Sequence, residues 1–268
     1  MTLSSHEEYW VKTFLYSDPA RLPCLDLLSR EFNNKRDNQS YLFITKKISN
    51  EVIKEASKKF RKIPFVDILS IVFMIYLSRL NHKDTFRISY TNPFLKQFTE
   101  QLDSFVSSEI PLKVDIIQSL SAEKGVKGFI EAKAQALKHK TYFLDIEERY
   151  PALKNLSNDK PDIKINIVES EKKLLQVKSD YLLEICMNTK GTLYGLVFPQ
   201  ELSELERQFI EAIPNHIKTL LEGLVQNPFS SIHELPLLTS EEEKQILMSW
   251  NDTKTEYPSD KTIHQLFE

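Results

Sequence analysis

Histidine exchanges a proton near neutral pH more readily than other side chains, so the histidines are the first candidates for acid–base chemistry. They are His6, His82, His139, His216, His233 and His264. No two of them are adjacent, and none has an aspartate four or five residues later. His139 ends a predicted helix, where it can stabilise the last carbonyl groups. We therefore interpret it as structural rather than catalytic.

Other side chains also lack the neighbours that their chemistry requires. No serine lies in a Gly-x-Ser-x-Gly turn. The stretch Gly125-Val126-Lys127-Gly128 lacks the Lys-Ser/Thr pair of a phosphate-binding loop. Asp145, Glu147 and Glu148 fall on a predicted surface turn and are not expected to hold a metal ion. The sequence therefore predicts no catalytic, cofactor-binding or metal-binding residue.

The composition is that of an ordinary globular protein. The 268 residues include 35 basic and 38 acidic side chains, a net charge of −3, and 41% hydrophobic residues. Without a basic excess, neither nucleic acid nor a membrane is expected as a partner. The apolar stretch 65–80 contains Asp67 and predicts a buried helix rather than a membrane span. The widely spaced Cys24 and Cys186, and a polar start without a signal peptide, predict a cytoplasmic protein.

Helix and strand patterns alternate through residues 1–228, which predicts an α/β domain with a mixed sheet flanked by helices. Ser49 and Ser203 are expected to cap helices, and 188–191 is expected to form a hairpin turn. We expect helices at 4–16, 49–61, 64–80, 118–138 and 203–225, and strands at 41–44, 86–90, 105–114, 163–167, 181–185 and 193–198.

Residues 229–268 change in character and predict an extended linker. Prolines interrupt them, and only 240–250 has a helical pattern. Five blocks follow one another there: Leu-Pro-Leu-Leu-Thr at 235–239, Glu-Glu-Glu at 241–243, Trp-Asn-Asp-Thr at 250–253, Tyr-Pro at 257–258 and Ile-His-Gln-Leu-Phe-Glu at 263–268. Together they resemble the condensation-to-adenylation linker of nonribosomal peptide synthetases, and the last block resembles the first helix of an adenylation domain.

The upstream region resembles the second half of a condensation domain, so the resemblance covers the whole chain. Glu8-Tyr9-Trp10 is similar to the helix that joins the two halves, and 41–91 to the elements that open the second half. Shorter similarities lie at 105–114, 139–143 and 179–182. The resemblance implies a single chloramphenicol-acetyltransferase-like half-domain over 1–228, followed by the linker at 229–268.

The family's catalytic motif, His-His-x-x-x-Asp-Gly, is absent from the 268 residues. In the family it lies in the first half, where its second histidine assists attack of an acceptor amine on a donor thioester. The chain begins where the second half starts, so the catalytic half is expected to be missing rather than mutated.

The resemblance thus implies a catalytically inactive, truncated condensation domain that acts as a structural platform for a following adenylation domain. That domain, in the parent synthetase, is expected to use ATP and Mg and to load a phosphopantetheine carrier. Contacts with it are expected from Trp250, Tyr257, Ile263, His264, Leu266 and Phe267. We expect residues 251–268 to be poorly anchored without that domain.

Three alternatives remain open. The chain could be one half of a split condensation enzyme, active only with a partner that carries the histidine motif. It could be a docking module for an upstream synthetase, or a piece of a longer protein.

The family has a loop beneath its catalytic tunnel at the position of 169–179. Here that connection is short and charged, and we predict that it is exposed to solvent and that the neighbouring face is polar.

Overall fold

The computed structural model describes residues 3–23, 41–154, 160–253 and 265 of the chain. It forms two compact units, Met1–Leu237 and Leu238–Glu268. The helices of the first unit are α1 (Leu3–Leu15), α3 (Asn50–Lys59), α4 (Phe65–Asn81), α5 (Pro93–Thr99), α6 (Ala122–Lys138), α7 (Ile146–Arg149), α8 (Glu171–Leu174) and α9 (Glu204–Gln226), with short 3₁₀ turns at Pro151–Leu153 and Ile232–Glu234. The strands are β1 (Tyr41–Lys47), β2 (Thr85–Thr91), β3 (Ile110–Asp115), β4 (Ile163–Val168), β5 (Leu183–Asn188) and β6 (Leu193–Pro199).

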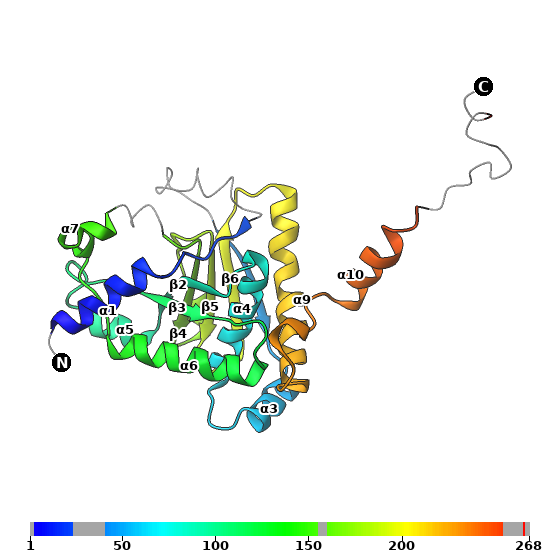
Figure 1. Ribbon diagram of the computed structural model, residues 1–268, viewed down its shortest axis with the longest axis horizontal. Coiled ribbons are helices and arrows are strands. Elements are labelled where there is room, and N and C mark those ends of the chain that lie inside the picture. The colour runs from blue at the N-terminus through cyan, green and yellow to red at the C-terminus, as the bar shows by residue number, and fades with distance from the viewer. Residues whose placement is uncertain (1–2, 24–40, 155–159, 254–264, 266–268) are drawn as a thin grey trace. The chain divides into compact units, whose positions relative to one another are not determined.

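The strands of the described residues form one mixed sheet in the order β1-β6-β5-β4-β2-β3 (Figure 1). The pairs β2–β4 and β4–β5 are parallel, and the remaining pairs are antiparallel. Helices flank this sheet, so the predicted fold class is confirmed. The chain leaves β2 for β3 on one side and β4 for β5 on the other, which makes the β2–β4 boundary a topological switch point.

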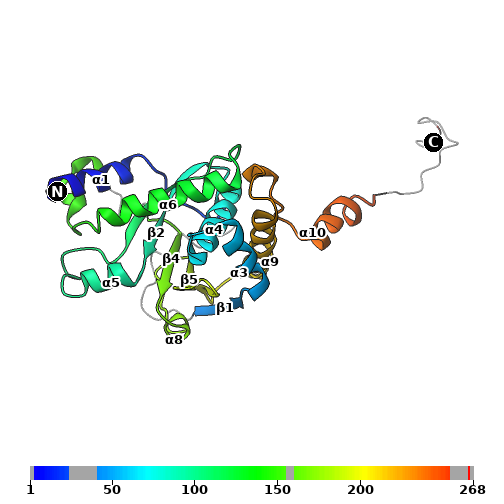
Figure 2. The ribbon, with the colours of Figure 1, turned by 90° about the horizontal axis from the view of Figure 1, so that it is seen from below.

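The two faces of the sheet differ in chemistry. Ile163, Ile165 and Ile167 of β4 face the main core, which also contains buried side chains of α4, α6 and α9. The alternate residues of β4 face the opposite side, where Val168 packs with Leu174 of α8 in a small second cluster. Figure 2 shows α4 and α9 on one side of the strands and α8 on the other. The second face is therefore apolar beside α8, and it carries polar side chains such as Lys164, Asn166 and Glu184 elsewhere.

Helix α4 occupies the centre of the main core, and most of its residues are buried. The aromatic side chains Phe65, Phe73 and Tyr76 are among them, as the sequence predicts. Its one buried acid, Asp67, forms an ion pair with Lys133 of α6. Pro64 precedes the helix as its N-cap rather than being its first residue.

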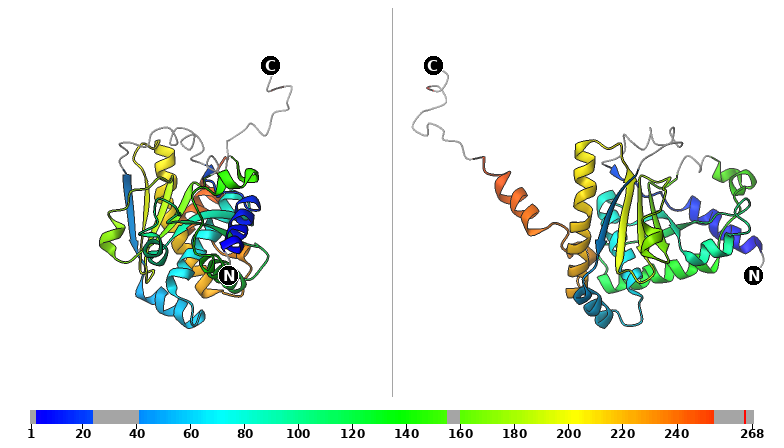
Figure 3. Two further views of the ribbon diagram at one scale, coloured as in Figure 1. Left: turned by 90° about the vertical axis from the view of Figure 1, so that its left-hand side faces the viewer. Right: turned by 180° about the vertical axis from the view of Figure 1, so that it is seen from behind.

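Helix α9 begins at the predicted capping box, in which Ser203 and Glu206 each accept a backbone N–H of the other residue. The helix runs alongside the strands in both views of Figure 3. Packing of the first unit continues past residue 228, because Ile232 and Leu235 are buried. The Arg79 guanidinium of α4 donates to the carbonyl oxygens of both residues. Residues 229–237 therefore pack with the domain.

Three short helices, α5, α7 and α8, depart from the predicted pattern, and α7 contains Glu147 and Glu148 of the predicted surface turn. Asn92 follows β2, and its side chain accepts the Leu95 N–H at 2.9 Å and so caps α5. Helix α8 lies within the connection 169–179. The strand predicted at 105–114 is shorter, since β3 begins at Ile110 and Phe105 is exposed.

Candidate functional site

The predicted contact residues belong to the second unit. It contains α10 (Ser240–Lys244) and a π-helical turn (Gln245–Ser249), so the predicted helix at 240–250 is present. Trp250 follows this helix and is 66% exposed. Tyr257, Ile263, His264, Leu266 and Phe267 lie outside the described residues. Their role in contacting another domain stays a prediction.

His139 lies at the C-terminus of α6, as expected, and packs against aromatic neighbours. Its ring stacks on Tyr9 of α1, with 4.0 Å between centroids, and meets the ring of His6 edge-on at 5.1 Å. Burial, together with the nearby His6 and Lys138, lowers the pKa of His139. This cluster fixes α1 onto α6. No group of three or more metal-binding side chains occurs among the described residues.

The second sheet face carries a network of ionic side chains around Lys164 of β4. The Lys164 ammonium lies 2.9 Å from the Glu109 carboxylate and 4.0 Å from that of Glu184 on β5. Tyr181 donates its hydroxyl to Glu109 and contacts Ser89 Oγ at 2.8 Å. These partners link β2, β4 and β5 to the segment before β3.

Opposing effects set the pKa values in this network. Burial favours a neutral Glu109, but Lys164 and the Tyr181 hydroxyl outweigh it and lower the pKa of Glu109. Burial likewise disfavours the charge of Lys164, yet Glu109 and Glu184 raise its pKa. Both groups therefore carry their charges at neutral pH. Burial and the nearby Glu184 raise the pKa of Cys186, so its thiol is not a ready nucleophile.

A second chain of hydrogen bonds leads from Glu184 to the edge of the sheet. The Asn166 amide of β4 donates to Glu184 Oε1 at 2.6 Å, and Lys96 Nζ of α5 donates to Asn166 Oδ1 at 2.8 Å. Glu184 is almost fully buried, and its Oε2 has no hydrogen-bond partner in the described part of the chain. This relay fixes the end of the Lys96 side chain against the sheet.

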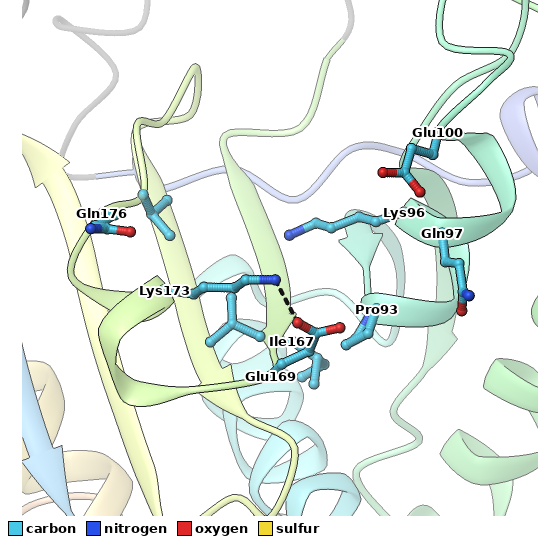
Figure 4. Close-up of a pocket in the computed structure, with 10 residues that line it drawn as sticks. Pro93, Lys96, Gln97, Glu100, Ile167, Glu169, Lys173 and Gln176 are labelled. Atoms are coloured by element: carbon cyan, nitrogen blue, oxygen red, sulfur yellow. Dashed lines mark hydrogen bonds and ion pairs between the residues drawn. The ribbon is translucent and has the colours of Figure 1, made fainter.

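The tip of Lys96 enters a cavity of about 660 Å³ between α5 and the segment that contains α8. Figure 4 shows Lys96 reaching across it toward Lys173 and Gln176, while Lys173 pairs with Glu169. The walls are Pro93, Lys96, Gln97, Glu100, Ile167, Val168, Glu169, Lys173, Gln176 and Val177. The volume lies within the range of about 300–1,000 Å³ that is typical of small-molecule sites.

The connection 169–179 that borders this cavity is mostly exposed, as the sequence predicts. However, Leu174 is fully buried and anchors it to the sheet. The sequence did not predict the cavity or the network. The one signal for them was the alternation of Lys164 and Asn166 with the isoleucines of β4, but it does not show that Lys164 lies opposite Glu184.

Comparison with known proteins finds sequence similarity between this chain and bacterial synthases. No family model matches the chain. Bacitracin synthase 3 of Bacillus licheniformis is 24% identical over 98% of this chain, and tyrocidine synthase 3 of Brevibacillus parabrevis is 41% identical over 61 residues, or 23% of this chain. The chain spans only 4% and 1% of these two proteins.

Solved structures share the fold. A four-domain nonribosomal peptide synthetase bound to AMP and glycine aligns with a TM-score of 0.62 at 13% identity, over 89% of this chain and 20% of that one. The starter condensation domain of rhizomide synthetase aligns with a TM-score of 0.58 at 12% identity, over 88% of this chain and 55% of that one. The sequence similarity and the shared fold together identify the chain as a relative of nonribosomal peptide synthetases that corresponds to the C-terminal part of a condensation domain.

Proposed function

We propose that the chain is a non-catalytic platform in a nonribosomal peptide synthetase and that its second unit binds a following adenylation domain. The supporting observation is a run of exposed apolar side chains in that unit. Leu247, Met248 and Trp250 are 68%, 64% and 66% exposed. Burial of each would contribute roughly 1.5–3 kcal/mol to association. Such a helix is a suitable contact for another domain.

In this role, these 268 residues do not form peptide bonds. They contain no His-His-x-x-x-Asp-Gly motif. The half-buried Glu109 and Lys164 hold each other charged, so neither is poised near neutral pH as a general acid or base. ATP, Mg and phosphopantetheine would serve other domains of the same cytoplasmic synthetase. The described residues contain no helix long and apolar enough to cross a membrane.

Binding to the adenylation domain of the same synthetase tests the platform role. We expect a stoichiometric complex in titration calorimetry and a weaker complex with the Trp250→Ala variant. Leu205→Ala is the matched control, because Leu205 is also highly exposed but lies on α9 of the first unit. No complex, or equal losses for both variants, would contradict the role.

A condensation assay tests the absence of catalysis. The chain is mixed with loaded donor and acceptor carriers, and dipeptidyl thioester is measured by mass spectrometry. We expect no product above the uncatalysed background. Product that disappears on substitution of any one histidine of the chain would overturn this assignment.

The split-enzyme role is a second candidate, favoured by exposed aromatic side chains of the first unit. Phe94 and Phe98 of α5 stack on each other and are 52% and 38% exposed. They could contact a separate condensation half. A stable complex with such a half that forms peptide bonds, and that is lost in a Phe94→Ala/Phe98→Ala variant but kept in Leu205→Ala, would favour this role over the platform.

A further inference from the structure

The cavity between α5 and α8 lies where the sheet topology favours ligand binding. Strands β2 and β4 are parallel, and Pro93 and Glu169 follow their carboxyl ends. The chain then turns in opposite directions, toward β3 and toward β5. In open α/β sheets such a switch point forms a crevice outside the strand ends, where ligands bind. This location is independent of the platform role of the second unit.

The Nζ atom of Lys96 extends into this cavity and is held there by the folded chain. It is positioned by Asn166, which is itself held by Glu184. Asn166 is a neutral acceptor, and within the described residues Lys96 forms no ion pair. An ammonium group has three N–H donors, so donors remain for a ligand. Lys173, in contrast, is already paired with Glu169.

The charges around Lys96 favour an anion. Burial, Lys164 and Lys173 disfavour the charged ammonium, and Glu184 only partly offsets them, so the pKa of Lys96 is lowered. A bound anion would relieve this imbalance. Glu100 and Glu169 border the same cavity, and they would repel a dianion more strongly than a monoanion.

The remaining walls define the rest of the ligand. Ile167, Val168 and Val177 provide an apolar surface, and Gln97 and Gln176 are neutral. A single lysine acts as a point charge, whereas phosphate groups favour several donors or the fork of an arginine. We propose that the cavity binds a small monocarboxylate, with its charged end on Lys96 and a short apolar body against Val168 and Val177.

The test titrates the full chain with sodium butyrate and follows backbone amide signals by NMR. We expect saturable shifts at Lys96 and at 167–169, with a Kd on the order of millimolar for so small a probe. Butylammonium and monobutyl phosphate should bind more weakly. Affinity for butyrate should fall as pH rises and Lys96 loses its proton.

Variants assign the binding to Lys96. Lys96→Met should weaken butyrate binding by about 10- to 100-fold, the effect of a charged hydrogen bond, and Lys96→Arg should retain part of it. Lys172→Met is the matched control, because Lys172 is an exposed neighbour on α8 that does not line the cavity. Glu100→Gln should tighten binding by between about 1.5- and 5-fold. Far-UV circular dichroism verifies that each variant is folded.

Three results would overturn the proposal. The first is the absence of shifts at the cavity in the folded wild-type chain. The second is equal butyrate affinity in the folded Lys96→Met and Lys172→Met variants. The third is binding of butylammonium or monobutyl phosphate as tight as that of butyrate.

Discussion

Lys164 Nζ lies between two carboxylates, 2.9 Å from the partly exposed Glu109 and 4.0 Å from the buried Glu184. Removal of this ammonium takes away the cation that pairs with both acids, and loss of one partner of a largely buried ion pair is costly. We expect Lys164→Met to lower the free energy of unfolding by about 3–5 kcal/mol. The measurement is urea unfolding at neutral pH.

Lys113→Met is the control for this variant. Lys113 forms an exposed ion pair with Asp115, 3.9 Å apart, whose loss should cost less than about 1 kcal/mol. Equal destabilisation by the two variants would show that the network around Lys164 contributes no more than a surface pair.

The same network predicts a pH dependence. The pKa of Glu109 is lowered on folding from its ordinary value of 4.5, so its contribution is present above that value and is lost as pH falls through the folded pKa. Glu109→Gln should therefore cost on the order of 1–3 kcal/mol at pH 7, and this difference should shrink below about pH 4.5. Urea unfolding of both proteins from pH 7 to 3 measures it. A constant difference across this range would contradict the assignment.

The sequence predicts these residues only in part. Alternation in β4 places Lys164 and Asn166 on the face opposite the isoleucines. It does not reveal that Glu184 lies opposite Lys164, because the register of two parallel strands depends on the whole sheet. The approach of Lys96 depends further on α5, a helix of seven residues that the sequence did not predict.

At the scale of elements, capping residues in the sequence predict where long helices begin. The sequence is a poorer guide to the presence of short helices. Ser49 and Ser203 accept backbone N–H groups as expected of caps. By contrast, Asn92 follows β2 and caps α5, a short helix that the sequence did not predict. Helix α8 has four residues, too few to show a helical period. Its position depends on burial of Leu174 against the sheet.

Two glycines test how the hairpin packs against α4. Gly191 has φ of 71°, and an added Cβ would lie 2.7 Å from the Val66 backbone. Gly128 lies within α6 with nothing within 4 Å of such an atom. We expect Gly191→Ala to destabilise the protein by more than about 1 kcal/mol, and Gly128→Ala to stabilise it by about 0.5–1 kcal/mol. Thermal unfolding of both variants measures the contrast, and the same sign for both would contradict this packing.

At the scale of the whole molecule, the alternation of helices and strands was sufficient to predict the α/β class, and the turn residues 188–191 predicted the hairpin of β5 and β6. The strand order was not predictable, because β2, β4 and β5 become neighbours through contacts between residues far apart in the chain. The end of the first unit at Leu237 was not predictable either, because it also depends on contacts between residues far apart in the chain. Gly223 of α9 leaves room for Pro236, since an added Cβ would lie 2.5 Å from its ring. The sequence around Gly223 does not indicate that Pro236 packs against it.

The division into two compact units makes a final prediction about stability. Because Trp250 is exposed and lies in the second unit, Trp250→Ala should change the unfolding free energy of the first unit by less than about 0.5 kcal/mol. Leu220→Ala in α9 should lower it by about 2–5 kcal/mol, because Leu220 is fully buried in the main core. Urea unfolding of the full chain, followed by near-UV circular dichroism of the buried aromatic residues, measures both. A loss for Trp250→Ala that approaches that of Leu220→Ala would mean that the second unit stabilises the first, and its exposed side chains could then not be assigned to a separate domain.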